Sequence, residues 1–407
     1  MMEGRLFFEF LQVAIGIRES VSVSISDADW HRLFDFCKRQ ALVGIGFAAV
    51  EKLHTVGIVC PVNLRMKWMA LALQIEKKNA LLNEQCKKLT EQYRHDGLAT
   101  CILKGQGNCL NYPEELRMRR MPGDIDLWAM PYEDISIAVQ TGKEDVKYIT
   151  CHGHRAVIEY VRMQYRLQGI DASPKACYHH IEAPTMDGTE VEVHYRPAFL
   201  RSPLRNWRMQ RWFENHADEC MKNRTHLGFS MMTSSVNVVY QMCHLYTHIF
   251  EGGIGLRQLM DYYFALRVWH NDVMECKDLQ SQGMWSEGMG TPVMSKEEVM
   301  AVLKSFGMGK FAAAVMYVLH KTFAMPTHYY ICKPNEKEGR KLLAEIMQGG
   351  NFGQYDTRDA ALKKGGMIKH GVWKLKRVMR LVSSYPEEAL WEPVFRVYHL
   401  LWRGING

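Results

Sequence analysis

Two aspartates, Asp124 and Asp126, stand one residue apart within an apolar run of the chain. If this run is a β-strand, its side chains alternate between two faces, so both carboxylates point the same way while Ile125 and Leu127 point into a core. Like charges about 6–7 Å apart repel each other, and a chain usually avoids such a pair unless a cation lies between them. Hard divalent cations such as magnesium prefer carboxylate oxygens together with substrate phosphate oxygens. The pair therefore predicts a divalent-metal site.

A glycine turn precedes the aspartate pair. Residues 98–103 are typical of a core strand, and Lys104, Gly105, Gln106 and Gly107 follow as a turn that opens a helix. This geometry directs backbone N–H groups toward a phosphate. Lys104 would neutralise a bound triphosphate; the alternative is an ordinary surface lysine.

A third acidic position lies on a later strand. An Asp-Gly pair at 187–188 is the strongest β-hairpin signal in the chain, with alternating residues on both sides. On the second strand of this hairpin, Glu190, Glu192 and His194 share one face. Glu192 would help to hold a metal or would act as general base on a hydroxyl, with Glu190 as the alternative carrier. The competing interpretation is an exposed strand face.

The glycine turn, the aspartate pair and the acidic strand together resemble the nucleotidyltransferase superfamily of the DNA polymerase β type. That superfamily carries a glycine turn, then a D-x-D strand, then a third carboxylate on a later strand. Over residues 65–265 the chain is similar to a subgroup of uncharacterised bacterial nucleotidyltransferases. Gln106 stands where many superfamily members carry serine. The shared motifs are Leu103-Lys104-Gly105, Arg120 to Leu127, Glu192 to Arg196, His244 with His248, and Gly255-Leu256-Arg257 with Asp261.

The resemblance implies a metal-dependent enzyme that moves a nucleoside monophosphate from a nucleoside triphosphate, such as ATP, to a hydroxyl acceptor. Asp124, Asp126 and Glu192 would be the catalytic residues and would hold Mg²⁺ or Mn²⁺. The acceptor stays open between a small hydroxylated molecule, a protein side chain and an RNA end. The residues expected to contact the nucleotide are Lys104, Gly105, Gln106, Gly107, Arg120 and Arg257.

Two pairs of side chains are spaced one helical turn apart. His244 and His248 have the spacing of zinc ligands, but no Glu follows as in H-E-x-x-H, so we expect partly buried polar residues facing a cleft. Arg257 and Asp261 would form a helix salt bridge or contact the nucleotide. The arginines of residues 117–120 would contact phosphates or be solvated.

A basic segment covers residues 363–380, where lysines and arginines are interleaved with apolar residues. The pattern is typical of a nucleic-acid-binding surface, which would suit a terminal transferase acting on RNA. It is equally typical of the basic face of a packed amphipathic helix, which is the interpretation we favour. The basic residues are Lys363, Lys364, Lys369, Lys374, Lys376, Arg377 and Arg380.

Composition bounds the class of protein. The 407 residues are 47% hydrophobic and carry a net charge of +7, which suits a folded chain with an acidic ligand but does not demand one. The eleven cysteines include no C-x-x-C pair, so we expect reduced thiols and a cytoplasmic location. Residues 6–16 are apolar but contain Glu9, which indicates a buried amphipathic helix and no signal peptide. No apolar run is long enough to cross a membrane.

We expect an α+β fold, with a small mixed β-sheet nucleotidyltransferase core, flanking helices and a mostly helical C-terminal domain. The predicted divisions are an N-terminal helical segment at 1–60, the core at 61–204 and the helical domain at 205–407. Other local predictions are a long helix over 61–95, a helix from Asn108 followed by a basic loop that ends at Arg120, helices over 131–140 and most of 143–168, and a loop over 271–295.

A different class of function is also compatible with these residues. A non-catalytic nucleotide-binding or regulatory protein would keep the carboxylates and the fold but lack a competent acceptor site. Intact Asp124, Asp126 and Glu192 favour the enzyme. Stabilisation by metal and nucleotide together, followed by pyrophosphate release, would separate the two.

Overall fold

The computed structural model describes residues 2–133, 135–140, 146–172, 174–282, 293–363 and 365–406. The fold is α+β and mostly helical, which confirms the predicted class. The chain divides into two compact units, each assembled from three separate stretches of sequence. The first unit comprises Met1–Ala80, Cys109–Pro122 and Val238–Ala389, and the second comprises Leu81–Asn108, Gly123–Asn237 and Leu390–Gly407.

A four-stranded mixed sheet forms the centre of the second unit, in the order β1-β2-β6-β5. β2 pairs with β1 in antiparallel fashion and with β6 in parallel fashion, while β5 and β6 form an antiparallel hairpin. The described residues add a separate two-stranded sheet, β3 with β4. The strands are β1 (Leu98–Ile102), β2 (Ile125–Pro131), β3 (Ile135–Gln140), β4 (Val146–Cys151), β5 (His180–Met186) and β6 (Thr189–His194).

The β5–β6 hairpin turns at the predicted Asp-Gly pair. Asp187 and Gly188 have φ of +48° and +75°, the left-handed geometry that suits this dipeptide in a tight hairpin turn. The register then shifts between Ala183 and Met186, because an irregularity interrupts the pairing of the two strands. As a result His180 stands opposite His194. If the pairing of Met186 with Thr189 continued without a shift, His180 would stand opposite Tyr195 instead.

Helices cover the sheets of the second unit. α7 (Gly153–Leu167) packs on β2 and β5 and also contacts the β3–β4 sheet, and its apolar stripe is buried, as an amphipathic helix requires. α9 (Ala217–Lys222) packs on β1. α8 (Pro203–Asn215) begins with proline at its first turn, where the missing N–H is harmless. α5 (Gln106–Cys109) is a single turn that follows β1.

The first unit is helical, and aromatic side chains fill much of its core. Trp68 contacts the rings of Phe10 and Phe34 at centroid distances of 5.9 and 5.0 Å, and its indole N–H donates to the Val43 carbonyl. Its helices include α1 (Met2–Ala14), α2 (Asp27–Arg39), α3 (Val43–Thr55), α6 (Glu114–Arg117), α11 (Leu256–Ser281), α12 (Lys296–Ser305), α13 (Gly309–Phe323), α14 (Glu336–Gly349), α15 (Ala360–Lys363) and α16 (Met367–Val382), with 3₁₀ turns η2 (Thr327–Tyr329) and η3 (Asn351–Gly353).

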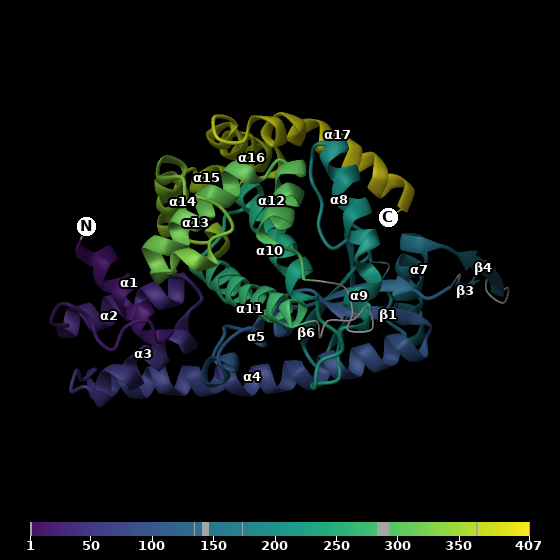
Figure 1. Ribbon diagram of the computed structural model, residues 1–407. Helices are drawn as coiled ribbons and strands as arrows, with labels where there is room; N and C mark the ends of the chain where they lie inside the picture. Colours follow the sequence, from purple (N-terminus) through teal and green to yellow (C-terminus); the bar gives the residue numbers. More distant parts are fainter. Residues whose placement is uncertain are drawn as a thin grey trace. The chain divides into compact units, whose positions relative to one another are not determined.

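Besides α5, whose last residue Cys109 belongs to the first unit, three longer helices among the described residues contain residues of both units. α4 (Val62–His95) runs as one uninterrupted helix, as predicted (Figure 1). The others are α10 (Ser234–Glu251) and α17 (Pro386–Asn406). α2 and α12 begin with capping boxes: Ser26 and Ser295 each accept a hydrogen bond from the third residue of the helix that follows.

Several local predictions were wrong. The helix predicted over 131–140 is strand β3, because alternating Ile135, Ile137 and Val139 favour a strand over the helix suggested by the acidic residues before them. Instead of one helix from Asn108 before the basic loop, this stretch contains only the single turns α5 and α6. The prediction that most of 143–168 is helical is confirmed by α7, but β4, which was not predicted, precedes this helix. The loop predicted over 271–295 begins later because α11 continues to Ser281; residues 283–292 lie outside the described residues.

Among the described residues, no helix is both long enough and apolar enough to cross a lipid bilayer.

Candidate functional site

Asp126 and Glu192 lie side by side on neighbouring strands of the four-stranded sheet. β2 and β6 run parallel, and the Cα atom of Asp126 stands opposite that of Glu192 in their register. Asp124 precedes β2, which begins at Ile125. Ile125 and Leu127 are buried, as the alternation predicted, but Asp126 is buried too, with 1% of its surface exposed. Both faces of β2 are therefore covered, and one of them carries a carboxylate.

The two oxygens of Asp126 differ: Oδ1 has two hydrogen-bonding neighbours, whereas Oδ2 has no hydrogen-bond partner among the described residues. Lys104 places its Nζ 2.9 Å from Oδ1, and His194 places its Nε2 3.1 Å from the same atom. Oδ2 is buried and has no hydrogen-bond partner among the residues that the structure describes. A buried carboxylate oxygen without a partner costs free energy, so Oδ2 is the natural ligand atom for a cation.

Three histidines gather beside these carboxylates. His194 Nε2 lies 3.4 Å from Glu192 Oε2, and His180 Nδ1 lies 4.0 Å from the same oxygen. His179 Nε2 is 2.9 Å from His180 Nδ1, and the ring centroids of His179 and His194 are 5.4 Å apart. The site is thus a cluster of carboxylates and imidazoles on three adjacent strands and on the residue before β5.

The carboxylates of the cluster titrate differently because their neighbours differ. The charge of Asp126, followed by burial, raises the pKa of Asp124. Burial disfavours the ionised form of Asp126, but the Lys104 charge and the His194 hydrogen bond outweigh burial and hold its pKa well below the usual range. Burial likewise opposes ionisation of Glu192, while the hydrogen bond from His194 leaves its pKa lowered. Asp126 and Glu192 are therefore ionised at neutral pH.

The pKa values of the basic groups in the cluster also shift in different directions. Burial opposes the charge of Lys104, yet the charge of Asp126 and then that of Asp124 raise its pKa to about 12. Burial, with a smaller contribution from His194, lowers the pKa of His180 to about 4. Burial acts in the same direction on His194, but its hydrogen bonds to the two carboxylates leave its pKa raised. At neutral pH, Lys104 is charged and His180 is a neutral imidazole.

The glycine turn lies against the strand that carries Asp126. The backbone N–H of Leu103 donates to the Asp126 carbonyl at 3.0 Å. Gly105 has φ of +57°, the left-handed region that favours glycine, and a Cβ on Gly107 would approach the Ile102 carbonyl oxygen to 3.0 Å. Both glycines therefore allow the chain to pass close to the sheet. The predicted order of strand, glycine turn and helix is confirmed, although the helix is one turn long.

Two groups of this turn are engaged within the unit. The side-chain amide of Gln106 is buried and donates to Asn83 Oδ1 at 2.7 Å, and the N–H of Gly107 donates to the Lys104 carbonyl at 3.2 Å. Gln106 would therefore contact a phosphate through its backbone and not through its side chain. The nucleotide-binding role of Lys104, Gly105, Gln106 and Gly107 stays a prediction.

The donor set fits a hard divalent cation. Asp124, Oδ2 of Asp126 and Glu192 offer carboxylate oxygens, the ligand type that Mg²⁺ and Mn²⁺ prefer. The raised pKa of Asp124 arises first from its proximity to Asp126, which shows that Lys104 only partly compensates the negative charges gathered here. An added divalent cation would remove the remaining repulsion.

Arg120 and Asp261 belong to the first unit and bind each other there. The Arg120 guanidinium donates to both oxygens of Asp261, from Nε at 2.7 Å and from Nη2 at 2.8 Å. Tyr112 adds a hydrogen bond of 2.7 Å to Oδ1. Asn79 donates to the carbonyl of Arg120. The nucleotide contact predicted for Arg120 stays a prediction, and its guanidinium is engaged with a buried carboxylate.

The other arginines predicted to meet the nucleotide or its phosphates also have neighbours within this unit. Arg257 donates from Nη1 to the Met121 carbonyl at 3.3 Å, and its guanidinium lies over the Phe352 ring. Asp261, the predicted partner of Arg257 on the same helix, binds Arg120 from a distant part of the chain. Arg117 donates to the Tyr112 carbonyl, and Arg119 forms ion pairs with Glu51 and Glu76.

His244 and His248 are half-buried, as predicted. Their ring centroids lie 4.3 Å apart in a T-shaped arrangement, and His248 Nδ1 is 3.4 Å from Glu251 Oε2. Within the described residues, the pair does not belong to a group of three metal-ligand side chains. The prediction that these histidines face a cleft is not tested.

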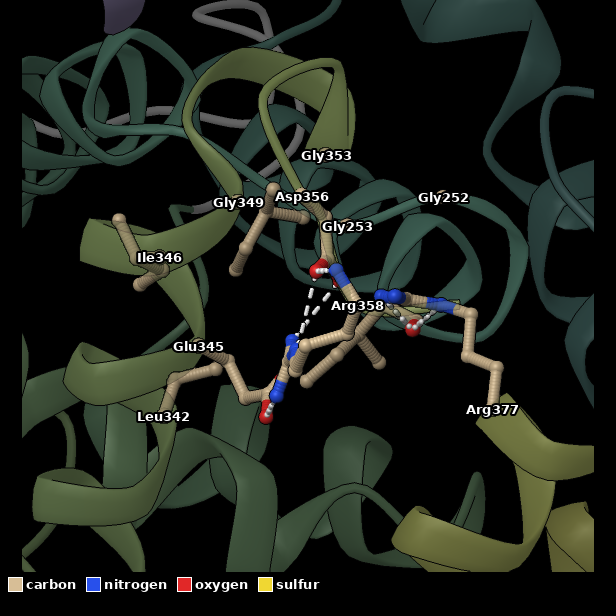
Figure 2. A pocket seen from close by; sticks show the side chains of 12 residues that line it. Gly252, Gly253, Leu342, Glu345, Ile346, Gly349, Gly353, Asp356, Arg358 and Arg377 are labelled. Atoms are coloured by element: carbon tan, nitrogen blue, oxygen red, sulfur yellow. Dashed lines mark hydrogen bonds and ion pairs between the residues drawn. The ribbon is translucent and has the colours of Figure 1, made fainter. Parts of the chain in front are cut away.

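The basic segment 363–380 comprises the last residue of α15 and most of α16. Several of its charged side chains make structural contacts. Arg377 is buried and donates twice to the Ile249 carbonyl, and burial lowers its pKa to about 10. Lys376 pairs with Asp359 at 3.0 Å. Figure 2 shows Arg377 in a pocket beside Arg358, which binds two carboxylates. These contacts favour the packed amphipathic helix over a nucleic-acid surface.

Sequence reasoning missed the two histidines at the start of β5. His179 and His180 were visible as a pair next to an alternating strand, and His194 was recognised within its motif. Their meeting depends on the register shift in the hairpin, which brings His180 opposite His194. A search for histidines on both strands of a predicted hairpin would have found the pair, but not its register.

Comparison with known families supports one assignment. A family model described as an uncharacterised nucleotidyltransferase matches residues 26–283, which include the glycine turn, the aspartate pair and Glu192. Comparisons with curated proteins and with solved structures found no match. Because the matched region covers more than half of the chain, this protein belongs to that family of uncharacterised nucleotidyltransferases.

Proposed function

We propose that this protein is a metal-dependent nucleotidyltransferase, which moves a nucleoside monophosphate from a nucleoside triphosphate to a hydroxyl acceptor. One observation carries the proposal: Asp126 and Glu192 stand opposite each other on parallel strands, and the Oδ2 atom of Asp126 is buried without a partner among the described residues. Asp124 adds a third carboxylate whose pKa is raised by the charge of Asp126.

Asp124, Asp126 and Glu192 would hold one or two Mg²⁺ or Mn²⁺ ions. Such ions would bridge the triphosphate and the acceptor, favour the ionised form of the attacking hydroxyl and stabilise the departing pyrophosphate. The lowered pKa of Glu192 argues that this carboxylate serves as a ligand and not as a general base, because an efficient base has a pKa near the working pH. Glu190 is exposed, whereas Glu192 lies beside Asp126, so Glu192 is the favoured third carboxylate.

Lys104 would have two tasks. In the structure its ammonium lies against Asp126, where it holds that carboxylate ionised. Because Lys104 begins the glycine turn, two residues after the end of β1, the same ammonium would also neutralise the phosphates of a bound nucleotide. The backbone at Gly105 comes close to the Asp124 carbonyl just before β2, so this turn would position the triphosphate next to the carboxylates.

The fold supports the wider assignment to the DNA polymerase β type. A strand, a glycine turn, an aspartate-bearing strand and a parallel neighbour with a third carboxylate occur in the order that this superfamily shares. We therefore propose that this chain is a metal-dependent member of the DNA polymerase β type.

The alternative is a non-catalytic nucleotide-binding protein. One observation favours it: the Lys104 ammonium already lies 2.9 Å from Asp126, in the position of a built-in counter-ion for the carboxylates. If that ion pair is permanent, the chain would bind nucleotide without turnover.

The test combines thermal melting with a pyrophosphate-release assay. Wild-type protein is melted with Mg²⁺ or Mn²⁺ and each nucleoside triphosphate, then assayed with small hydroxylated molecules, proteins including the chain itself, and RNA. The enzyme predicts stabilisation that requires metal and nucleotide together, followed by release of pyrophosphate with one acceptor class. Stabilisation without turnover across all three acceptor classes would favour the regulatory alternative.

The catalytic carboxylates are tested with matched variants. Asp124→Asn should lower turnover about a thousand-fold, or roughly 4 kcal/mol of barrier, because a metal ligand is lost. The same variant should raise the melting temperature of the metal-free protein, since it relieves repulsion from Asp126. Glu192→Gln should also inactivate, whereas Glu190→Gln, on the exposed part of the same strand, should not. Equal activity of the Glu190 and Glu192 variants would exclude the assigned third carboxylate.

A further inference from the structure

The imidazole side of the cluster is a site in its own right. His179, His180 and His194 each offer one ring nitrogen, and these three nitrogens all lie within 4.8 Å of one another. His180 and His194 face each other across the β5–β6 hairpin, and His179 lies one residue before β5. The register shift in the hairpin is what brings the rings together.

The two nitrogens of His194 have different surroundings. Nε2 lies within hydrogen-bond distance of Asp126 Oδ1, at 3.1 Å. Nδ1 is buried and has no hydrogen-bond partner among the described residues. Histidines that ligate a metal usually give their other ring nitrogen to a carboxylate, which fixes the orientation and tautomer of the ring. His194 has this arrangement: a carboxylate on one nitrogen and an unsatisfied nitrogen left over.

We propose that His179, His180 and His194 form a binding site for a late transition-metal ion of the Zn²⁺ class, separate from the carboxylate site for Mg²⁺ or Mn²⁺. Imidazole nitrogen suits zinc and its neighbours, whereas magnesium requires oxygen. Three histidines with an open fourth position is a known zinc ligand set. The carboxylate Oδ2 of Asp126 stays available to the harder cation.

The geometry needs little adjustment. In a tetrahedral zinc site with Zn–N bonds of about 2.0–2.1 Å, the ligand nitrogens are about 3.3 Å apart. His179 Nε2 and His180 Nδ1 are 2.9 Å apart here, and no two of the three ligand nitrogens are more than 4.8 Å apart. Small rotations of the rings would therefore complete the site. The cation would replace the hydrogen bond between His179 and His180.

The two proposed sites meet at Asp126. Its Oδ1 supports His194, and its Oδ2 faces no described partner, so one carboxylate would orient a zinc ligand and coordinate a second cation. None of the three histidines is among the residues assigned to catalysis, although His194 lies beside Asp126 and Glu192, so the two sites adjoin each other but have separate ligands.

The test uses the full chain without a purification tag, freed of metal by chelation. Zn²⁺ affinity is measured by competition with a chromophoric chelator, and Co²⁺ serves as a spectroscopic probe of geometry. We expect one tight Zn²⁺ equivalent and the intense visible absorption of tetrahedral Co²⁺. His179→Ala and His180→Ala should each weaken Zn²⁺ binding by more than the roughly 10–100-fold that the loss of a supporting contact costs.

The matched control is another pair of histidines. His270 and His328 lie in the first unit with ring centroids 5.3 Å apart, the same distance as His180 and His194. Removing them in His270→Ala/His328→Ala should leave the Zn²⁺ affinity unchanged. Equal losses in this control and in the His179 and His180 variants would overturn the proposal, as would weak octahedral Co²⁺ absorption in the wild type.

Two further measurements keep the result clear. X-ray absorption on wild-type protein loaded with Zn²⁺ counts the imidazole ligands directly, so the proposal is decided even if a variant fails to fold; three imidazoles support it, and one or none overturns it. Asp124→Asn should abolish nucleotidyl transfer while Zn²⁺ affinity stays unchanged, so failure of one proposal is distinguishable from failure of the other.

Discussion

Two buried aspartates, one in each compact unit, make the most instructive comparison in this molecule. Asp126 has 1% of its surface exposed and Asp261 has 3%. Each lies beside a basic side chain from a distant part of the sequence, Lys104 for Asp126 and Arg120 for Asp261. Similar burial and similar charge pairing nevertheless lead to different chemistry.

Asp261 is fully satisfied. The Arg120 guanidinium binds both of its oxygens, and the Tyr112 hydroxyl donates to one of them. Planar bidentate pairs of this kind are specific in geometry and leave no acceptor atom for a ligand. The cluster connects the short stretch around α6 with α11, so it is a structural link within the first unit.

Asp126 is satisfied on one side only. Lys104 is a point charge on a flexible stem, and both it and His194 approach Oδ1, so Oδ2 is left without a described partner. Glu192 and Asp124 add negative charge beside it. Burial and ion pairing therefore do not distinguish the two aspartates, whereas the oxygen without a described partner makes Asp126, and not Asp261, the candidate metal ligand.

The largest effect on stability should come from breaking the satisfied pair. Arg120→Met leaves the charge of Asp261 buried without its cation, so the free energy of unfolding should fall by about 3–5 kcal/mol. The double variant Arg120→Met/Asp261→Leu should recover most of that loss, because both charges are gone. Urea unfolding followed by fluorescence measures both. Mg²⁺ should not restore Arg120→Met; restoration would mean that Asp261 is itself a metal ligand.

The parallel change in the second unit should behave differently. Lys104→Met removes the cation beside Asp126 and should cost about 2–3 kcal/mol in metal-free protein, less than the bidentate pair because Lys104 is partly exposed. Added Mg²⁺ or Mn²⁺ should recover the loss, since a divalent cation binds the same carboxylate through Oδ2. Melting temperatures with and without metal give the result. Equal insensitivity of both variants to metal would remove the distinction between the two aspartates.

Local features of this fold were predictable because they depend on neighbours in the chain. The caps at Ser26 and Ser295, the uninterrupted helix α4 and the Asp-Gly hairpin all follow from short sequence patterns. The sequence predicted that the third carboxylate lies on a later strand, but not the parallel pairing of β2 with β6. β3 was mistaken for a helix because acidic residues before it imitate a helix start.

The partners of the charged groups could not be predicted in the same way. Arg120 and Asp261 are far apart in sequence, and only the tertiary fold brings the guanidinium to that carboxylate. The histidine cluster depends on a one-residue register shift within β5, and such a shift changes which residues stand opposite each other. The sequence identified Asp124, Asp126 and Glu192 as a group, but not the contact of Lys104 with Asp126.

A third charged cluster lies in the first unit, and the pH dependence of its contribution to stability extends the comparison. Arg358 donates to Glu345 at 2.7 Å and to Asp356 at 2.9 and 3.0 Å, as Figure 2 shows. The hydrogen bonds from Arg358 lower the pKa of Glu345, and burial, which acts in the opposite direction, offsets only part of this effect. This contrasts with Asp124, whose pKa is raised.

A lowered carboxylate pKa makes the native state more stable above the unfolded pKa of about 4.3, and that stability is lost as pH falls through the folded pKa. Glu345→Gln should therefore cost about 1–2 kcal/mol at pH 7 and progressively less below about pH 4. Unfolding at a series of pH values measures the difference from wild type. A constant difference at all pH values would mean that the Arg358 contact does not depend on the charge of Glu345.

A similarly small effect is expected at the turn that brings Lys104 to Asp126. Gly105 has φ of +57°, so Gly105→Ala should cost about 1–2 kcal/mol, whereas Gly105→Asn should cost less because asparagine tolerates the left-handed region. Space alone does not forbid a side chain, since the nearest atom to a Cβ there is the Asp124 carbonyl oxygen at 3.5 Å.

If the turn sets the position of Lys104, both Gly105 variants should also weaken nucleotide-dependent stabilisation, and the alanine variant should weaken it more because its backbone is more strained. Gly349→Ala, with nothing within 4 Å of its Cβ and no left-handed backbone, serves as the control and should leave both measurements unchanged. Equal stability of the alanine and asparagine variants would show that backbone strain at Gly105 does not determine the geometry beside Asp126.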